Sequence, residues 1–120
     1  MHRDVRWPNI LRDPSTGETL LADFELAAPA GKPLPERFRS SEFLPPEARG
    51  GGAYSAMGDV WQVGQLVRAW ANPPGSAPRG LSPSADAFAA RLTADAPALR
   101  PTADAALVDE AWLQLRPAPP

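Results

Sequence analysis

Three side chains that could bind a cation or move a proton flank a short segment near the start of the sequence. Asp4 and Asn9 precede this segment and Asp23 follows it. Oxygen donors of this kind suit a hard cation such as Mg²⁺, which takes few protein ligands and completes its shell with phosphates and water. A carboxylate beside such a metal could position a hydroxyl and accept its proton, and Arg6 would place a positive charge near a phosphoryl oxygen. The alternative is ordinary turn chemistry, because Asn and Asp are common in loops.

The segment between these residues is predicted to fold as a short β-hairpin. The stretches NIL and GETLLADF enclose RDPSTG, which has Pro, Ser and Gly in positions typical of a turn. The pairing is predicted to join residues about 10–12 to residues about 19–22. Because a hairpin brings its two ends together, we expect Asp4, Asn9 and Asp23 to converge on one site.

Beyond the hairpin, the sequence predicts a long loop followed by helices. The stretch 25–43 contains several helix breakers and no sustained period, and LPPEARGG after it could hold one helical turn. The first helix has Val at i, i+3 and i+7 from Val60, and the next two begin after the capping residues Ser82 and Thr102. The fold class is therefore mainly α with one short hairpin. The helices are predicted at about 56–71, 84–94 and 102–115.

The composition describes one small domain and argues against several classes of function. The chain has 120 residues and a net charge of −2, without the basic stripe that nucleic-acid binding needs. It has no cysteine and one histidine, which argues against disulfides and against thiolate or histidine-rich metal sites. No apolar run approaches the length of about 18 residues of a membrane span, and no signal-peptide pattern occurs. We therefore expect a cytoplasmic or nuclear location, no secretion, and neither nucleic acid nor membrane as a partner.

Five short motifs lie in order along the chain: HRDVRWPN, ADFELA, FLPPEA, GDVWQVG and DAPALRPTADAAL. They resemble, in turn, the catalytic loop, the D-F-G segment, the A-P-E segment, the central-helix motif D-x-W-x-x-G and the closing segment D-P-x-x-R-P-T of protein kinases. The catalytic-loop pattern H-R-D-x-x-x-x-N is matched at every fixed position. Glu25 stands where D-F-G has Gly, and Pro45 stands where A-P-E has Ala. The details VRWPN and DFE are similar to small fungal kinase-like domains. The resemblance covers the C-terminal lobe of a serine/threonine kinase.

The resemblance implies a reaction and the residues that would perform it. The reaction is transfer of the γ-phosphate of ATP to a Ser or Thr hydroxyl of a protein substrate, with Mg²⁺. Asp4 would be the catalytic base, and Arg6 would contact the γ-phosphate. Asn9 and Asp23 would bind the Mg²⁺ ions that hold ATP. His2 is expected to be a packing residue rather than a base.

The resemblance also implies structural roles. Arg3 would pair with a phosphorylated residue of the long loop, for which Ser40 and Ser41 are candidates, although serines are common in loops. Glu47 would form a buried ion pair with Arg100, the alternative being an exposed, unpaired Arg. The remaining positions with a structural role are Asp59, which would hold the backbone of the catalytic loop, and Phe24 and Trp61, which would pack.

The chain departs from whole kinases because it begins at the catalytic loop. Whole kinases carry a Gly-rich loop, a strand Lys and a helix Glu before this loop, and phosphoryl transfer depends on the positioning that such groups provide. We therefore expect a partial kinase-like domain over residues 1–116, followed by a Pro-rich disordered end at 117–120. This chain alone is expected to be inactive and to bind neither Mg²⁺ nor ATP tightly. Glu25 could add a metal ligand or repel the nucleotide.

Two alternatives to an active kinase stay open. The chain could be a pseudokinase-type binding module that holds a protein partner through an exposed apolar face. It could also be a fragment produced by an incorrect gene model. For a kinase the expected partner is a protein substrate, and for a binding module it is a bound protein. The closing stretch RPAPP could be a polyproline II ligand or simply a disordered end.

Overall fold

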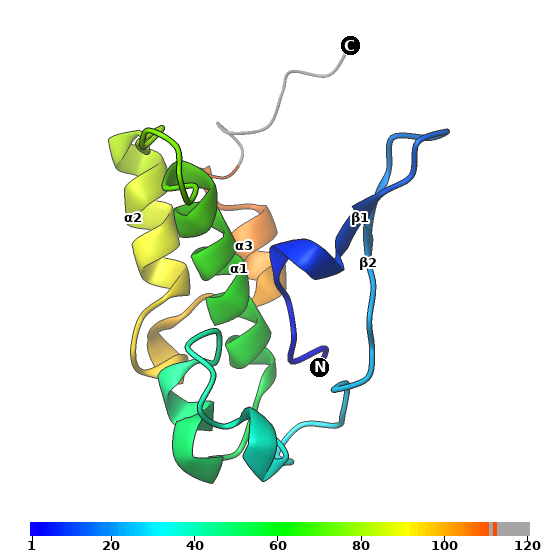
Figure 1. The fold of residues 1–120 in the computed structure, drawn as a ribbon. Coiled ribbons are helices and arrows are strands. Elements are labelled where there is room, and N and C mark those ends of the chain that lie inside the picture. Colours follow the sequence, from blue (N-terminus) through cyan, green and yellow to red (C-terminus); the bar gives the residue numbers. More distant parts are fainter. Residues whose placement is uncertain (111, 113–120) are drawn as a thin grey trace.

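The computed structural model describes residues 1–110 and 112, and it shows a mainly helical fold with one β-hairpin (Figure 1). The fold class predicted from the sequence is confirmed. In Figure 1, α1 is central, α2 packs along it, and the hairpin projects away from the helices. No helix among the described residues is long and apolar enough to cross a membrane. The predicted Pro-rich end at 117–120 lies outside the described residues.

The elements, with η for 3₁₀ helices, are η1 (Trp7–Asn9), β1 (Ile10–Arg12), β2 (Thr19–Leu21), η2 (Glu36–Phe38), η3 (Pro46–Gly51), α1 (Ala56–Ala71), α2 (Pro83–Leu92), η4 (Pro97–Leu99) and α3 (Ala103–Leu107).

The hairpin forms because its turn residues satisfy one another. The carboxylate of Asp13 accepts hydrogen bonds from the hydroxyl and the backbone N–H of Ser15 and from the backbone N–H of Thr16. These bonds, with the one from the Ser15 hydroxyl foremost, hold the pKa of Asp13 below its ordinary value. The predicted pairing is confirmed. The antiparallel register is Ile10↔Leu21, Leu11↔Leu20 and Arg12↔Thr19.

The helix α1 is the scaffold of the fold. Ser55 caps its start by accepting a hydrogen bond from the N–H of Met57, and the helix covers the predicted range 56–71. The long loop predicted at 25–43 is irregular apart from η2, and η3 forms where one helical turn was predicted. The apolar side chains gather in two clusters along this scaffold. One consists of Leu34, Leu44, Ala48 and Tyr54, and the other of Val60, Phe88 and Leu92.

Gly64 allows α1 and α2 to approach each other closely. A Cβ atom at this position would lie 2.5 Å from Cγ2 of Thr93 and 2.8 Å from Cβ of Leu92. Real Cβ atoms do not approach other atoms to such distances, so any larger residue would push the two helices apart. The glycine of the GDVWQVG motif is therefore a packing requirement.

We expect the substitution Gly64→Ala to destabilise the fold. Ala favours a helix by about 1 kcal/mol over Gly, but overpacking of a tight contact typically costs about 1–3 kcal/mol, and α1 cannot relax away from α2 without opening the second cluster. The midpoint of urea unfolding measures the difference. Val63→Ala, at an exposed position of the same helix, is the control and should change the midpoint little. An increase in stability of Gly64→Ala would contradict the close approach.

The last predicted helix is interrupted. The sequence predicted one helix over 102–115, but α3 ends at Leu107 and the backbone leaves helical geometry at Val108 and Asp109, whereas residues 110 and 112 are helical again. The carboxylate of Asp109 instead meets the guanidinium of Arg91 on α2, at 2.6 Å. Leu107 and Val108 are exposed, whereas Ala106 and Trp112 pack against the cluster of Val60, Phe88 and Leu92. The predicted positions 111 and 113–115 lie outside the described residues.

Candidate functional site

The N-terminal loop is held on α1 by two polar side chains. The backbone N–H groups of His2 and Arg3 donate to the two carboxylate oxygens of Asp59, each at 2.8 Å. One helical turn further along, the amide of Gln62 accepts a hydrogen bond from the N–H of Val5 at 2.9 Å and donates to the carbonyl of Arg3 at 3.1 Å. The loop backbone is therefore fixed from one face of a rigid helix, as the residues of a catalytic site require.

Asp4, Arg6 and Asn9 contact one another within this loop. The side-chain amide of Asn9 donates to the carboxylate and to the backbone carbonyl of Asp4, both at 2.8 Å. Nε of Arg6 lies 3.0 Å from the other carboxylate oxygen of Asp4. Asn9 is buried, whereas Asp4 is only half-buried. The arrangement presents an oriented carboxylate at the surface, which can accept a hydrogen bond from an approaching hydroxyl.

Asp23 lies just after the end of β2. The backbone of its neighbour Ala22, and not the Asp23 side chain, is hydrogen-bonded to the N-terminal loop. The N–H of Ala22 donates to the carbonyl of Asn9 at 2.8 Å, and Nε2 of His2 lies 2.8 Å from the carbonyl of Ala22. The Asp23 side chain is exposed and accepts a hydrogen bond from the N–H of Glu25 at 3.3 Å. The structure thus brings Asp4 and Asn9 into direct contact and the backbone beside Asp23 up to Asn9, but it gives Asp23 no contact with either side chain.

The donor set could hold Mg²⁺ only as part of a larger shell. No group of three or more His, Cys, Asp and Glu side chains in the described part of the chain is arranged to hold a metal ion. The amide nitrogen of Asn9 faces Asp4, so its amide oxygen is the atom left for a cation. Together with the exposed carboxylate of Asp23, this makes two oxygen donors. Mg²⁺ commonly binds with one or two such ligands and takes the rest from phosphates and water.

Arg3 does not face a phosphorylation site in this structure. Its buried guanidinium donates to the backbone carbonyls of Leu26, Lys32 and Pro33. Its backbone is also unusual, because Arg3 and Asp23 are the two non-glycine residues with positive φ among the described residues, at 71° and 61°. Such backbone strain tends to gather at functional sites. Arg3 therefore acts here as a clamp on the long loop that follows the hairpin.

Neither of the two candidate phosphorylation sites forms a hydrogen bond with Arg3 in the described structure. Ser40 is exposed. Ser41 is half-buried, and its hydroxyl accepts a hydrogen bond from the N–H of Phe43 at 3.2 Å. A phosphate on either serine would have to compete with backbone carbonyls for Arg3, because Nε and Nη1 of its guanidinium already bond to them.

Glu47 and Arg100 form the ion pair that the sequence analysis expected. The guanidinium of Arg100 meets both carboxylate oxygens of Glu47, at 2.7 and 2.8 Å. It also donates to the carbonyls of Met57, Ala94 and Asp95. The Arg100 side chain has no exposed surface. A fully buried guanidinium with five acceptors ties η3 to the segments on either side of η4.

The aromatic residues of the motifs have different surroundings. Trp61 is buried, as expected for a packing residue. Phe24 is 63% exposed and touches the structure edge-on through the ring of His2, with ring centres 4.9 Å apart. Phe24 therefore packs edge-on against one ring while most of its own surface stays exposed. His2 is a packing and hydrogen-bonding residue, as expected.

Two residues of the site were missed by sequence reasoning. Tyr54 is fully buried and donates its hydroxyl to Asp59 at 2.9 Å. Gln62 bonds to three loop groups, the third being the carbonyl of Phe43. The only signal in the sequence was an amide at position 62 among the apolar residues of a helix. Buried polar groups need partners, so this amide could have been taken as an anchor.

The chain matches no protein-family model. It is similar to the Crinkler effector protein 8 of Phytophthora infestans, with 34% identity over 119 residues that cover 89% of this chain and 18% of the relative. It is also similar to a ribosomal protein S6 kinase-related protein of Homo sapiens. There the identity is 36% over 69 residues, which cover 56% of this chain and 17% of the relative. The chain spans less than a fifth of the length of either relative. The comparison therefore supports a kinase relationship for part of the chain.

Proposed function

We propose that this chain is the C-lobe portion of a protein-kinase-like domain. The observation that carries the proposal is the Asp4 carboxylate, held by Asn9 and Arg6 in a loop that Asp59 anchors to α1. An oriented carboxylate beside a guanidinium suits the deprotonation of a hydroxyl that attacks a phosphoryl group. The similarity to a kinase-related protein supports the same reading.

In the proposed reaction the side chains of this chain would divide three tasks. Asp4 would accept the proton of a substrate Ser or Thr hydroxyl, and Arg6 would face the phosphoryl oxygens. Asn9 and Asp23 would hold Mg²⁺, which neutralises the charge of the ATP phosphates when it is bound. We propose the cytoplasm or nucleus as the location, in line with the lack of cysteine.

We further propose that residues 1–120 alone do not transfer phosphate. The single lysine of the sequence, Lys32, lies in the loop after the hairpin, and its carbonyl is held by Arg3. A phosphate clamp made only of Arg6 and the oxygen ligands of Asn9 and Asp23 cannot hold ATP in line with a hydroxyl, and phosphoryl transfer depends on that alignment.

The test examines the 120-residue chain and, where its gene encodes a longer product, that full product as well. Mg²⁺ and ATP should leave the melting temperature of the 120-residue chain unchanged, with no transfer of labelled phosphate to a general protein substrate. A shift that Asp23→Ala abolishes would overturn the claim of inactivity. In the full product, Asp4→Asn should reduce transfer by about a hundredfold or more. Arg12→Gln, on the exposed hairpin, is the matched control and should leave transfer unchanged.

A second candidate function is a binding module without catalysis. The observation that favours it is the pair Leu11 and Leu20, which lie opposite each other on one face of the hairpin and are both exposed. Exposed apolar groups gathered in one place mark an interaction surface. A full gene product that transfers no phosphate, with or without Asp4→Asn, would favour this candidate over the kinase.

A further inference from the structure

A glycine-rich segment with an arginine at its start follows the first turn of η3. Arg49 and the glycines after it, Gly50, Gly51 and Gly52, are consecutive in the sequence. The backbone leaves helical geometry at Arg49, and Gly50 and Gly51 have positive φ angles of 76° and 94°. A Cβ atom at Gly50 would meet nothing within 4 Å beyond its chain neighbours. The main chain beside Arg49 therefore has no side chains and has room around it, so that another molecule can approach it closely.

The guanidinium of Arg49 is only partly used within the fold. Its Nε donates to the carbonyl of Leu44 at 3.0 Å, and its Nη2 donates to the carbonyl of Glu42 at 3.2 Å. The group lies 5.8 Å from the ring centre of Trp61. Within the described part of the chain, Nη1 makes no hydrogen bond and Arg49 forms no ion pair. Because Arg49 is also exposed, its charged side chain is accessible and one of its terminal nitrogens is free to react.

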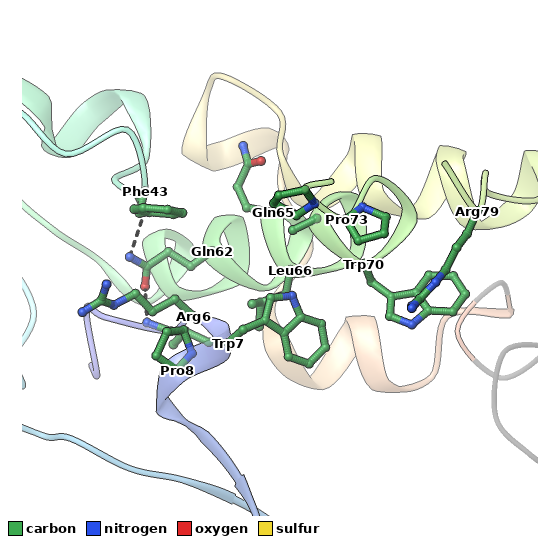
Figure 2. A pocket seen from close by; sticks show the side chains of 13 residues that line it. Arg6, Trp7, Pro8, Phe43, Gln62, Gln65, Leu66, Trp70, Pro73 and Arg79 are labelled. Carbon is green, nitrogen blue, oxygen red and sulfur yellow. Dashed lines mark hydrogen bonds between the residues drawn. The ribbon is translucent and has the colours of Figure 1, made fainter. Parts of the chain in front are cut away.

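Arg49 can leave its two acceptors without releasing the loop to which they belong. Both acceptors are neutral backbone carbonyls, and the bond to Glu42 lies at the surface. Between them, the carbonyl of Phe43 accepts a separate hydrogen bond from Gln62 of α1, at 3.1 Å (Figure 2). Leu44 is itself buried in the first apolar cluster. The loop is thus held by α1 and by the core when the Arg49 side chain turns away from it.

Other arginines lack this combination of features. Four of them are buried or paired with a carboxylate, namely Arg3, Arg6, Arg91 and Arg100. The sequence has one other Arg-Gly step, at Arg79, which is exposed, but a single glycine follows it and Leu81 comes next. An enzyme that modifies a guanidinium must draw the whole side chain into a narrow pocket. A run of glycines beside the arginine favours this, because it lets the two backbones come close.

We propose that Arg49 is a site of methylation by an arginine methyltransferase, with the methyl group on Nη1. A terminal nitrogen of the guanidinium attacks the methyl group of a sulfonium donor, S-adenosylmethionine. The N–C bond forms, the S–C bond breaks with its electron pair going to sulfur, and the nitrogen gives one proton to a base of that enzyme. Methylation keeps the positive charge of Arg49 and removes an N–H donor that the fold does not use. The proposal goes beyond the proposed function, since it needs neither ATP nor phosphoryl transfer.

The experiment incubates the 120-residue chain with a purified arginine methyltransferase that accepts Arg-Gly-Gly peptides and with radiolabelled S-adenosylmethionine. Fragmentation mass spectrometry then locates the methyl group, which we expect on Arg49. Arg49→Lys keeps the positive charge and should lose the label, with circular dichroism to confirm that the variant is folded. The matched control Arg79→Lys removes the other Arg-Gly step and should keep the label. A synthetic peptide of residues 45–54 should also be labelled.

Each of several results would overturn the proposal. A label on Arg79 in place of Arg49, or a label that survives in Arg49→Lys, would assign the modification to another residue. A peptide that is labelled while the folded chain is not would mean that the fold withholds the side chain. An unlabelled peptide would mean that the segment is no substrate. The methylated chain should keep its melting temperature, because Nε and Nη2 retain their acceptors; a lowered value would contradict the placement on Nη1. The assay contains no ATP, so a chain that fails as a kinase can still pass it.

Discussion

Replacing Arg100 by Ala should lower the free energy of unfolding by about 3–5 kcal/mol. The substitution would leave the Glu47 carboxylate partly buried without its cation, and three backbone carbonyls would lose a donor. Since small domains are stable by only about 5–15 kcal/mol, the variant should lose a large fraction of its stability. Urea unfolding followed by tryptophan fluorescence measures the loss.

A double-mutant cycle separates the ion pair from the other contacts of Arg100. Glu47→Ala removes the carboxylate alone, and the double variant removes both partners. We expect a coupling energy of at least about 2 kcal/mol between the two positions, because Glu47 and Arg100 form an ion pair only with each other among the described residues. Arg100→Lys should recover only a small part of the stability, since one ammonium cannot replace a two-pronged contact and three carbonyl bonds.

Two outcomes would contradict this account. The first is a loss of less than about 1 kcal/mol in Arg100→Ala, the magnitude expected of an exposed pair. The second is a coupling energy near zero, which would mean that Glu47 and Arg100 stabilise the fold independently of each other. Either result would remove the pair as the link between η3 and the segments that flank η4.

The sequence predicted local structure well where the signal was itself local. The turn residues after Asp13 define the hairpin and its register, and the cap at Ser55 and the breakers after Ala71 define α1. The break at Val108 and Asp109 within the last predicted helix was missed. It coincides with the ion pair between Asp109 and Arg91 of α2, a contact that leaves no trace in the apolar pattern.

In the candidate site too, contacts between residues close in the sequence could be predicted, and contacts between distant residues could not. Asp4 and Asn9 share one short loop, so their contact could be expected from the chain alone. The anchors Tyr54 and Gln62 could not, because Gln62 bonds to residues 19 to 59 positions away. The pairing of Glu47 with Arg100 came from the family resemblance, since no local pattern joins residues 53 positions apart. The hairpin predicted that Asp23 would lie near the loop. In the structure Asp23 has a left-handed backbone, and its carboxylate accepts a hydrogen bond from the N–H of Glu25.

Removing the carboxylate of Asp59 is the second change with a large expected effect. Asp59→Ala would leave three donors without an acceptor: the N–H groups of His2 and Arg3 and the hydroxyl of Tyr54. An unpaired buried donor costs about 1–3 kcal/mol. Water can reach part of this site, so we expect a loss of about 3–4 kcal/mol in the free energy of unfolding rather than the full sum.

Tyr54→Phe is the matched control because it removes one donor and keeps the carboxylate. Burial, followed by the negative charge of Asp59, raises the pKa of Tyr54 far above its ordinary value. The hydroxyl is therefore protonated and able to donate at any pH used for the measurement. We expect Tyr54→Phe to cost about 1 kcal/mol, well below the loss in Asp59→Ala.

Hydrogen exchange tells whether Asp59 positions the loop or only stabilises the fold. If Asp59 holds the loop, the amides of His2 and Arg3 should exchange faster in Asp59→Ala by more than the change in global unfolding accounts for. The same amides should keep their protection in Tyr54→Phe, where both of their acceptors remain. Equal protection in the two variants would mean that Gln62 and the hairpin suffice to hold the backbone around Asp4. In that case the orientation of the candidate base would no longer depend on Asp59.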